Sequence, residues 1–209
     1  MQQHEQQRHG PGGFNRRDFL KGSGAAVAAT AIATSEQEAL AQKKGQASVQ
    51  GPGKVEVTLT VNGQQHKLSV EPRTTLLDAL RDQLNLTGCK DDYDTTSCSG
   101  SDTVIIDGKA VYASIRLAIE VQGQKIQTVE SLRNGDQVDE VIKGFIQNDA
   151  MQCGFCTPGF VMATRAFLNR KPKATLEEIR DGLGGNICRC GTYNGITACA
   201  LEIAKKGGA

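Results

Sequence analysis

The chain has no tryptophan, only 4% aromatic residues and a formal net charge of +1 over its 209 residues. A charge so close to zero argues against a nucleic-acid-binding protein, which carries a basic excess. No run of about 18 apolar residues occurs, so no transmembrane helix is expected. The three histidines, among them His66, are isolated and suggest no ligand set. Scarce aromatic residues together with 24 glycines indicate one or two small, loop-rich domains.

The N-terminal residues contain the parts of a twin-arginine export signal in the right order. Arg16 and Arg17 belong to a twin-arginine motif, a mildly apolar stretch runs on to Thr34, and small residues around Ala41 offer a cleavage site. We therefore predict that residues 1–41 are a signal peptide and that the mature protein is periplasmic. A disordered tail and a weak membrane anchor are the alternatives. Residues 42–53 are polar, contain Gly and Pro, and are predicted to be a linker.

Residues 54–130 have the pattern hairpin, helix, hairpin, strand. Apolar residues alternate from Val55 to Val61, and Asn62-Gly63 is a strong hairpin turn. Thr75 with Asp78 forms a capping box that opens a helix. The predicted elements are strands at 55–61, 67–70, 103–106, 110–112 and 126–129, and a helix at 75–84. This order predicts a β-grasp, ferredoxin-like domain.

Residues 131–205 change to a helical period. One apolar stripe is formed by Val138, Val141, Ile142, Phe145 and Ile146. Further helices are expected from Thr157, as N-cap before Pro158, from a capping box at Thr175, and from about Asn194. Four short helices predict a small bundle, so the fold class is α+β. Cys199, on an apolar helical face, is expected to be a buried small hydrophobe.

Four of the seven cysteines lie in two short motifs, Cys153-Gly154-Phe155-Cys156 and Cys188-Arg189-Cys190. Four thiolates are what a two-iron cluster needs, and each motif is short enough to hold one iron. Glycines beside the motifs would let backbone approach the sulfides.

Three other interpretations of these cysteines stay open at this point. A structural zinc site also uses four cysteines, although a Cys-x-Cys pair is unusual for tetrahedral geometry. Two disulfides are conceivable in an oxidising compartment, but a bridge between Cys188 and Cys190 would be strained. Unligated core cysteines fit poorly beside so many glycines.

The stretches Gln152–Gly159 and Gly185–Tyr193 resemble the helical-domain signature of the xanthine dehydrogenase and aldehyde oxidoreductase family. The match extends from about Val55 to Ile203. With the export signal added, the chain is most similar to the small subunits of periplasmic aldehyde oxidoreductases. The resemblance implies a ferredoxin-like domain with one 2Fe-2S cluster, followed by a helical domain with a second.

The resemblance also implies partners and residue roles. A large subunit would bind molybdopterin and hydroxylate an aldehyde or N-heterocycle, and an FAD-binding subunit or another acceptor would take the electrons. Gln152 matches a position that faces the pterin, and Cys190 matches a cluster ligand that contacts it. Cys153, Cys156 and Cys188 match the other ligands, and no residue here matches a catalytic one. A redox-impaired structural paralogue and a metal-binding module without redox chemistry are the alternative functions.

The ferredoxin-type cluster loop of the family is degenerate in this chain. Three ligand positions hold Tyr93, Ser101 and Ser114, while Cys98 remains as a remnant. Asp102 looks like an inserted residue, and loop glycines are replaced as well. Even with Cys89 recruited, two thiolates are too few for an ordinary cluster. A local reading-frame error would not explain Ser114. We predict that this second cluster is lost and that the scaffold around it still folds.

Overall fold

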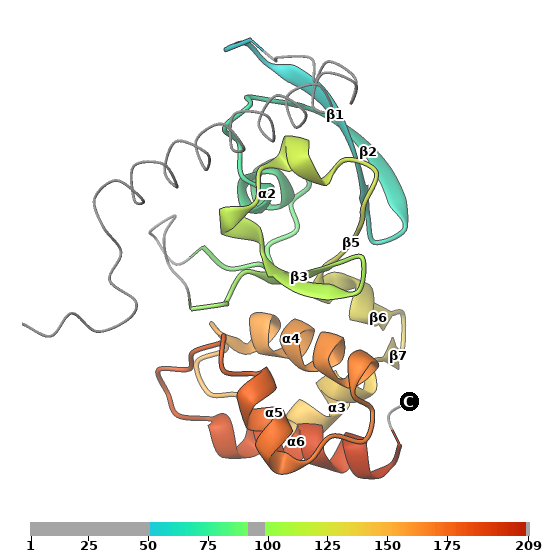
Figure 1. The fold of residues 1–209 in the computed structure, drawn as a ribbon, viewed down its shortest axis with the longest axis vertical. Coiled ribbons are helices and arrows are strands. Elements are labelled where there is room, and N and C mark those ends of the chain that lie inside the picture. Colours follow the sequence, from blue (N-terminus) through green and yellow to red (C-terminus); the bar gives the residue numbers. More distant parts are fainter. Residues whose placement is uncertain (1–50, 92–98, 208–209) are drawn as a thin grey trace, which may run out of the picture. The chain divides into compact units, whose positions relative to one another are not determined.

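A five-stranded sheet, a two-stranded sheet and five α-helices make up the part of the chain that the computed structural model describes, residues 51–91 and 99–207 (Figure 1). The five strands are β1 (Val55–Val61), β2 (Gln64–Val70), β3 (Thr103–Ile106), β4 (Lys109–Tyr112) and β5 (Lys125–Gln127). Their order across the sheet is β2-β1-β5-β3-β4. β1 and β5 run parallel, and the other neighbours are antiparallel.

Two tight turns set the register of the sheet. Asn62 and Gly63 join β1 to β2 with φ angles of 51° and 81°, and Asp107 and Gly108 join β3 to β4 with 47° and 79°. Two successive positive φ angles are typical of the hairpin turn whose twist matches that of its strands. Both hairpins predicted from the sequence are therefore confirmed.

The helical elements of this half cover one face of the sheet. Thr75 forms the predicted capping box with Asp78 and begins α2 (Leu76–Asp78), which continues as the π-helical turn η1 (Ala79–Gln83). Their leucines join the sheet residues in one core. Short 3-10 helices follow the second hairpin: η2 (Ala113–Ile115), η3 (Ala118–Val121) and η4 (Val129–Leu132).

The second half consists of a small hairpin and four helices. The hairpin pairs β6 (Arg133–Asn134) with β7 (Gln137–Val138). The helices are α3 (Glu140–Gln147), α4 (Thr157–Arg170), α5 (Leu176–Gly182) and α6 (Tyr193–Lys205), and they share one apolar core. Cys199 is fully buried in it, as predicted. None of the helices in the described ranges is long and apolar enough to cross a membrane.

Strand β3 connects the two halves because both of its faces are buried. Val104 and Ile106 face the core under α2, while Ile105 packs with Met162 and Ala166 of α4. Side chains of a strand alternate between faces, so a run of four buried residues requires cover on both sides. Helix α4 supplies that cover on the second face (Figure 1).

Two details of the helical half differ from the sequence prediction. Val138 lies in β7, before α3, and Ile146 is 73% exposed although both were assigned to the apolar stripe. At about 100° per residue, position 146 is turned about 140° away from the buried Val141. Helix α4 begins with Cys156 as N-cap residue, one position before the predicted Thr157.

An ion pair anchors α4 to the start of α3. The Arg165 guanidinium donates to Asp139 at 2.6 Å and to Glu140 at 3.1 Å, and its side chain is only 11% exposed. Asp139 also caps α3 by accepting the Val141 N–H at 2.8 Å. The largely buried Arg165 therefore holds α3 and α4 together and supports the first turn of α3.

Replacing Arg165 with methionine should lower the free energy of unfolding by about 2 kcal/mol, between the values of exposed and fully buried pairs. Lys171→Met is the matched control, because the Lys171–Glu178 pair is 54% and 43% exposed and should contribute under about 0.5 kcal/mol. Urea denaturation of the holo-protein measures both. Equal losses in the two variants would contradict this account of Arg165.

Candidate metal centre

The four motif cysteines lie in two loops that each lead into a helix. Cys153 and Cys156 immediately precede α4, and Cys188 and Cys190 lie in the irregular segment before α6. Cys156 and Cys188 are buried, whereas Cys153 and Cys190 are exposed. Both helices begin at these loops, so their positive ends point toward the place where an anionic group would bind.

The thiols of the two motifs lie near one another. Cys188 influences the pKa of Cys156, and Cys153 influences that of Cys190. Within the described ranges, no group of three or more Cys, His, Asp or Glu side chains is close enough to hold one metal ion. The buried thiols Cys156 and Cys188 are therefore neighbours, and so are the exposed thiols Cys153 and Cys190. This donor set fits a two-iron cluster, in which each iron takes two thiolates.

Cys188 is the thiol that is most easily ionised. Its burial alone would raise its pKa, but hydrogen bonds from the side chain and backbone of Thr192 outweigh burial and lower the pKa to about 7. The Thr192 hydroxyl lies 3.2 Å from the Cys188 sulfur. Burial and then the contact with Cys188 raise the pKa of Cys156 to about 12. Because thiolates are the metal ligands, Cys188 is prepared for ligation before Cys156.

Thr192 and Tyr193 support Cys188 in a way that the sequence analysis missed. Thr192 is the N-cap residue of α6 but makes no side-chain capping bond, because its hydroxyl contacts the sulfur. The Tyr193 hydroxyl accepts the Cys188 N–H at 2.8 Å. The sequence spacing could have indicated this contact, because Thr192 lies four residues after Cys188 and just before a predicted helix.

The glycines near the motifs have separate structural reasons. Gly154 and Gly191 have φ angles of 83° and 81°, which L side chains rarely adopt. A Cβ at Gly185 would lie 2.6 Å from the Tyr112 hydroxyl, which donates a hydrogen bond to the Gly185 carbonyl. Gly185 therefore makes room for the Tyr112 side chain of β4.

Comparison with known proteins adds to this geometry. A family model described as a 2Fe-2S binding domain matches residues 128–201, and a model of the twin-arginine translocation pathway signal matches residues 13–33. The aldehyde oxidoreductase iron-sulfur-binding subunit PaoA of Escherichia coli is 37% identical over 206 residues, which cover 91% of this chain and 88% of that one. The chain belongs to the iron–sulfur subunits of the xanthine dehydrogenase and aldehyde oxidoreductase family.

Two further relatives each match more than two thirds of the chain. The nicotine 6-hydroxylase small subunit of Paenarthrobacter nicotinovorans is 38% identical, over 71% of this chain and 89% of its own length. A chain of quinoline 2-oxidoreductase from Pseudomonas putida 86 has the same fold, with a TM-score of 0.68 and 34% identity over 75% of this chain and 99% of that chain. The resemblance inferred from the motifs is thereby confirmed.

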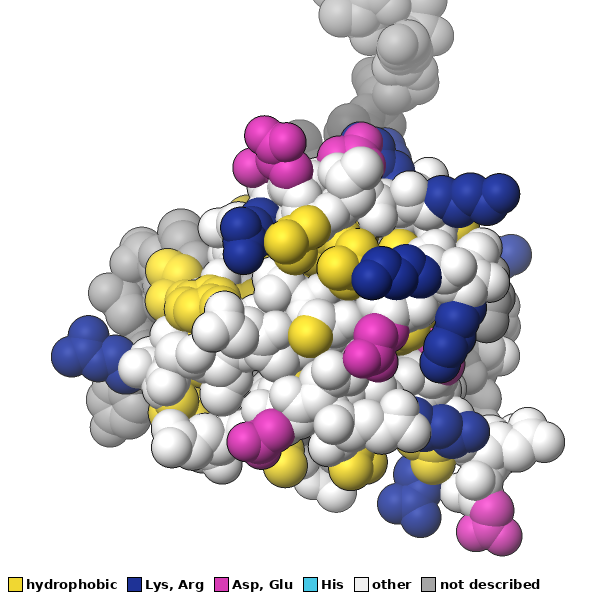
Figure 2. All heavy atoms as spheres, turned by 90° about the horizontal axis from the view of Figure 1, so that it is seen from below, with side chains coloured by type: hydrophobic (Ala, Val, Ile, Leu, Met, Phe, Trp, Pro, Cys, Tyr) yellow, Lys and Arg dark blue, Asp and Glu magenta, His cyan; other side chains and the backbone are white. Residues whose placement is uncertain are grey.

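Apolar side chains surround the exposed cysteines of this iron–sulfur subunit. Met151, Phe155, Ile187 and Tyr193 are 53%, 45%, 56% and 42% exposed and each lies within three residues of a motif cysteine. Gln152 is exposed among them. On the face that Figure 2 shows, hydrophobic side chains lie at the left and across the upper centre and lower edge, among scattered charged side chains.

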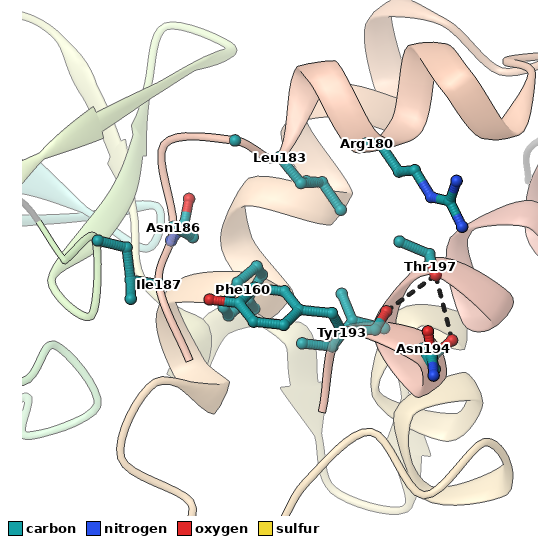
Figure 3. Close-up of a pocket in the computed structure, with 10 residues that line it drawn as sticks. Phe160, Arg180, Leu183, Asn186, Ile187, Tyr193, Asn194 and Thr197 are labelled. Carbon is teal, nitrogen blue, oxygen red and sulfur yellow. Dashed lines mark hydrogen bonds between the residues drawn. The ribbon is translucent and has the colours of Figure 1, made fainter. Parts of the chain in front are cut away.

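A cavity of about 360 Å³ adjoins the cysteine loop. Ile187 comes from that loop, Tyr193 from the first turn of α6, and Phe160 from α4 (Figure 3). The rings of Phe160 and Tyr193 meet edge to face, with centroids 6.0 Å apart and an interplanar angle of 82°. This contact holds the first turn of α6 against α4 beside the cysteines.

Hydroxyl and carboxylate groups lie close together in the described part of the loop that the sequence analysis identified as degenerate. The hydroxyls of Ser99 and Ser101 lie 2.9 Å apart, and the Asp102 carboxylate accepts the Ser114 N–H at 2.7 Å. Asp102 is 3% exposed; its Oδ1 atom and the Ser114 hydroxyl are buried without a hydrogen-bond partner. Tyr93 and Cys98 lie outside the described residues.

Cys89 is the one cysteine among the described residues of this half. It is 2% exposed, and burial followed by the nearby Glu130 and Asp102 carboxylates raises its pKa to about 12. One thiol is fewer than the four ligands that a two-iron cluster takes. The described residues of this half therefore do not by themselves supply a thiolate-bound cluster.

Proposed function

We propose that the chain is the electron-transfer subunit of an exported, molybdopterin-dependent aldehyde or N-heterocycle hydroxylase. A large partner subunit binds molybdopterin and oxidises the substrate, and an FAD-binding subunit or another acceptor receives the electrons. The observation that carries this proposal is that four cysteines from two separate loops lie near one another, Cys156 by Cys188 and Cys153 by Cys190. A 2Fe-2S cluster bound there supplies a one-electron relay.

The ligands of this cluster are Cys153, Cys156, Cys188 and Cys190. The contacts favour one iron between Cys156 and Cys188 and the other between Cys153 and Cys190, in place of one iron for each motif. The first iron is then buried and the second faces the surface. Exposed Gln152 and the apolar side chains around Cys153 and Cys190 form the contact with the molybdopterin subunit, because exposed apolar clusters favour interfaces.

The domain organisation follows from the sequence pattern. Residues 1–41 are the export signal, residues 42–53 the linker, residues 54–130 a β-grasp, ferredoxin-like domain and residues 131–205 a four-helix domain that holds the cluster. The order hairpin, helix, hairpin, strand and the parallel pairing of β1 with β5 support the first domain. The shared core of α3, α4, α5 and α6 supports the second.

The ferredoxin-like domain of this chain holds no second cluster. Ser101 and Ser114 support this proposal, because hydroxyl oxygens are weaker iron ligands than the thiolates they replace. The Ser101 hydroxyl also lies 2.9 Å from the Ser99 hydroxyl, and the Asp102 carboxylate accepts the Ser114 backbone N–H. Electrons then pass from the cluster of the helical domain to the acceptor without a second cluster in this chain.

Counting iron and acid-labile sulfide in protein purified from the periplasmic fraction tests the proposal. We expect two irons and two sulfides per chain, and one paramagnetic centre after reduction. Four irons with two distinguishable centres would contradict the loss of the second cluster. A full-length, folded protein without iron would overturn the proposed function, and retention in the cytoplasm would contradict export.

A further inference from the structure

Residues 99–103, which follow the degenerate loop, are bonded directly to the cysteine loop before α6. The Ile187 N–H donates to the Ser99 carbonyl at 2.8 Å. The Asn186 side-chain amide donates to the Gly100 carbonyl at 2.8 Å and to the Thr103 hydroxyl at 3.1 Å. Because Asn186 is two residues before Cys188, these bonds fix the backbone at the point where the ligand loop begins.

The same segment also touches the start of α4. A Cβ atom at Gly159 would lie 2.0 Å from the Gly100 carbonyl oxygen and 2.9 Å from the Ser101 Cα atom. Such distances mean that the first turn of α4 packs against the segment backbone to backbone. Gly159 is three residues after Cys156, so the segment is in contact with the surroundings of both motifs.

The cysteine loop is held by individual contacts and not by the regular hydrogen bonds of a helix or strand. Residues 186–191 belong to no helix or strand. Asn186 is only 7% exposed, and both hydrogens of its amide nitrogen are used in the two bonds to the segment. A buried amide with both donors satisfied holds a loop more firmly than exposed contacts do.

We propose that residues 99–103 act as a brace that sets the distance between the two cysteine motifs, with Asn186 as its positioning residue. The brace is the part of the ferredoxin-like half that acts on the retained cluster. This inference rests on the proposed function, because it assigns the brace to a cluster held by Cys153, Cys156, Cys188 and Cys190. It gives the half without a cluster a role in the redox properties of the other half.

Two variants remove the brace contacts without adding charge. Asn186→Leu removes both donors at similar volume, and Thr103→Val removes one acceptor while it keeps the side-chain shape. Asn169→Leu is the control, because Asn169 is exposed near the end of α4. The readouts on full-length holo-protein are the rate of iron release to a chelator, the paramagnetic spectrum of the reduced cluster and its midpoint potential.

We expect Asn186→Leu to release iron about 10–100-fold faster than the parent, as supporting residues of metal ligands do when replaced. Its spectrum and potential should change as well, which a loss of global stability alone would not cause in the folded fraction. In Thr103→Val, the iron release rate, spectrum and potential should change in the same direction but by less. If Asn186→Leu does not fold, the Thr103→Val result decides whether the brace affects the cluster. Asn169→Leu should match the parent.

The outcomes separate this inference from the proposed function. A folded parent without iron overturns both. A parent with two irons, and variants with parental release rates and spectra, overturns the brace alone. The brace is likewise contradicted if Asn169→Leu changes the cluster as much as Asn186→Leu does.

Discussion

Replacing Cys156 with serine should remove both irons and destabilise the helical half of the protein. Cys156 is buried next to Cys188, so its loss takes away one of two ligands of the buried iron. A hydroxyl is a weak substitute for a thiolate, and a two-iron cluster that loses one ligand loses its bridging sulfides as well. Metal binding is coupled to folding. The free energy of unfolding should therefore fall by the binding free energy that is lost, and the transition should occur at a lower denaturant concentration.

The metal-free proteins provide the sharpest control for this prediction. After chelation, the parent and Cys156→Ser should unfold within about 1 kcal/mol of each other, because the substitution itself is small. Cys199→Ser makes the same chemical change in the same core, beside the Val141 carbonyl, and should keep both irons. Two irons in Cys156→Ser, or their loss from Cys199→Ser, would contradict the ligand assignment.

Local signals in the sequence predicted much of the fold. The capping boxes at Thr75 and Thr175 begin helices as expected, since both hydrogen bonds of each box form. The Asn62-Gly63 and Asp107-Gly108 turns join the predicted strands. These features depend on residues within a few positions of one another, so a single sequence contains the information that determines them.

Contacts between distant residues could not be predicted from the sequence in the same way. Ile146 fits the helical period loosely and nevertheless faces outward, because only the packing of α3 against its neighbours decides which positions are covered. The contact of the Thr192 hydroxyl with the Cys188 sulfur is not visible in the local sequence pattern. The close contact of Gly185 with Tyr112, which lies 73 positions away, is equally hidden there.

The candidate site combines both kinds of information. The motif spacing identifies the four cysteines but not which thiols meet, because Cys-x-x-Cys and Cys-x-Cys each permit one iron per motif. The fold adds that Cys156 lies near Cys188 and Cys153 near Cys190, which is the basis of the pairing proposed above. The substitutions at Ser101 and Ser114 were visible in the sequence, whereas the Asp102 carboxylate as partner of Ser114 required the structure.

Replacing Gly159 with alanine should be the most disruptive single methyl addition near the cluster. The added Cβ would meet the Gly100 carbonyl oxygen at 2.0 Å and the Ser101 Cα atom at 2.9 Å, and neither can move as a side chain can. Overpacking against backbone should lower the free energy of unfolding by about 3 kcal/mol, although alanine favours the helix by up to about 1 kcal/mol over glycine. The first turn of α4 must move away from β3, and Cys156 moves with it.

Gly53→Ala is the matched control, because nothing lies within 4 Å of a Cβ at that position. It should unfold like the parent and keep its iron. In Gly159→Ala, chemical denaturation should show the lost stability, and the reduced cluster should show a changed paramagnetic spectrum. Because α4 packs directly against the brace, the loss of stability and the change in the spectrum should occur together. A stable Gly159→Ala variant with the parental spectrum would therefore mean that this contact determines neither the fold nor the position of Cys156.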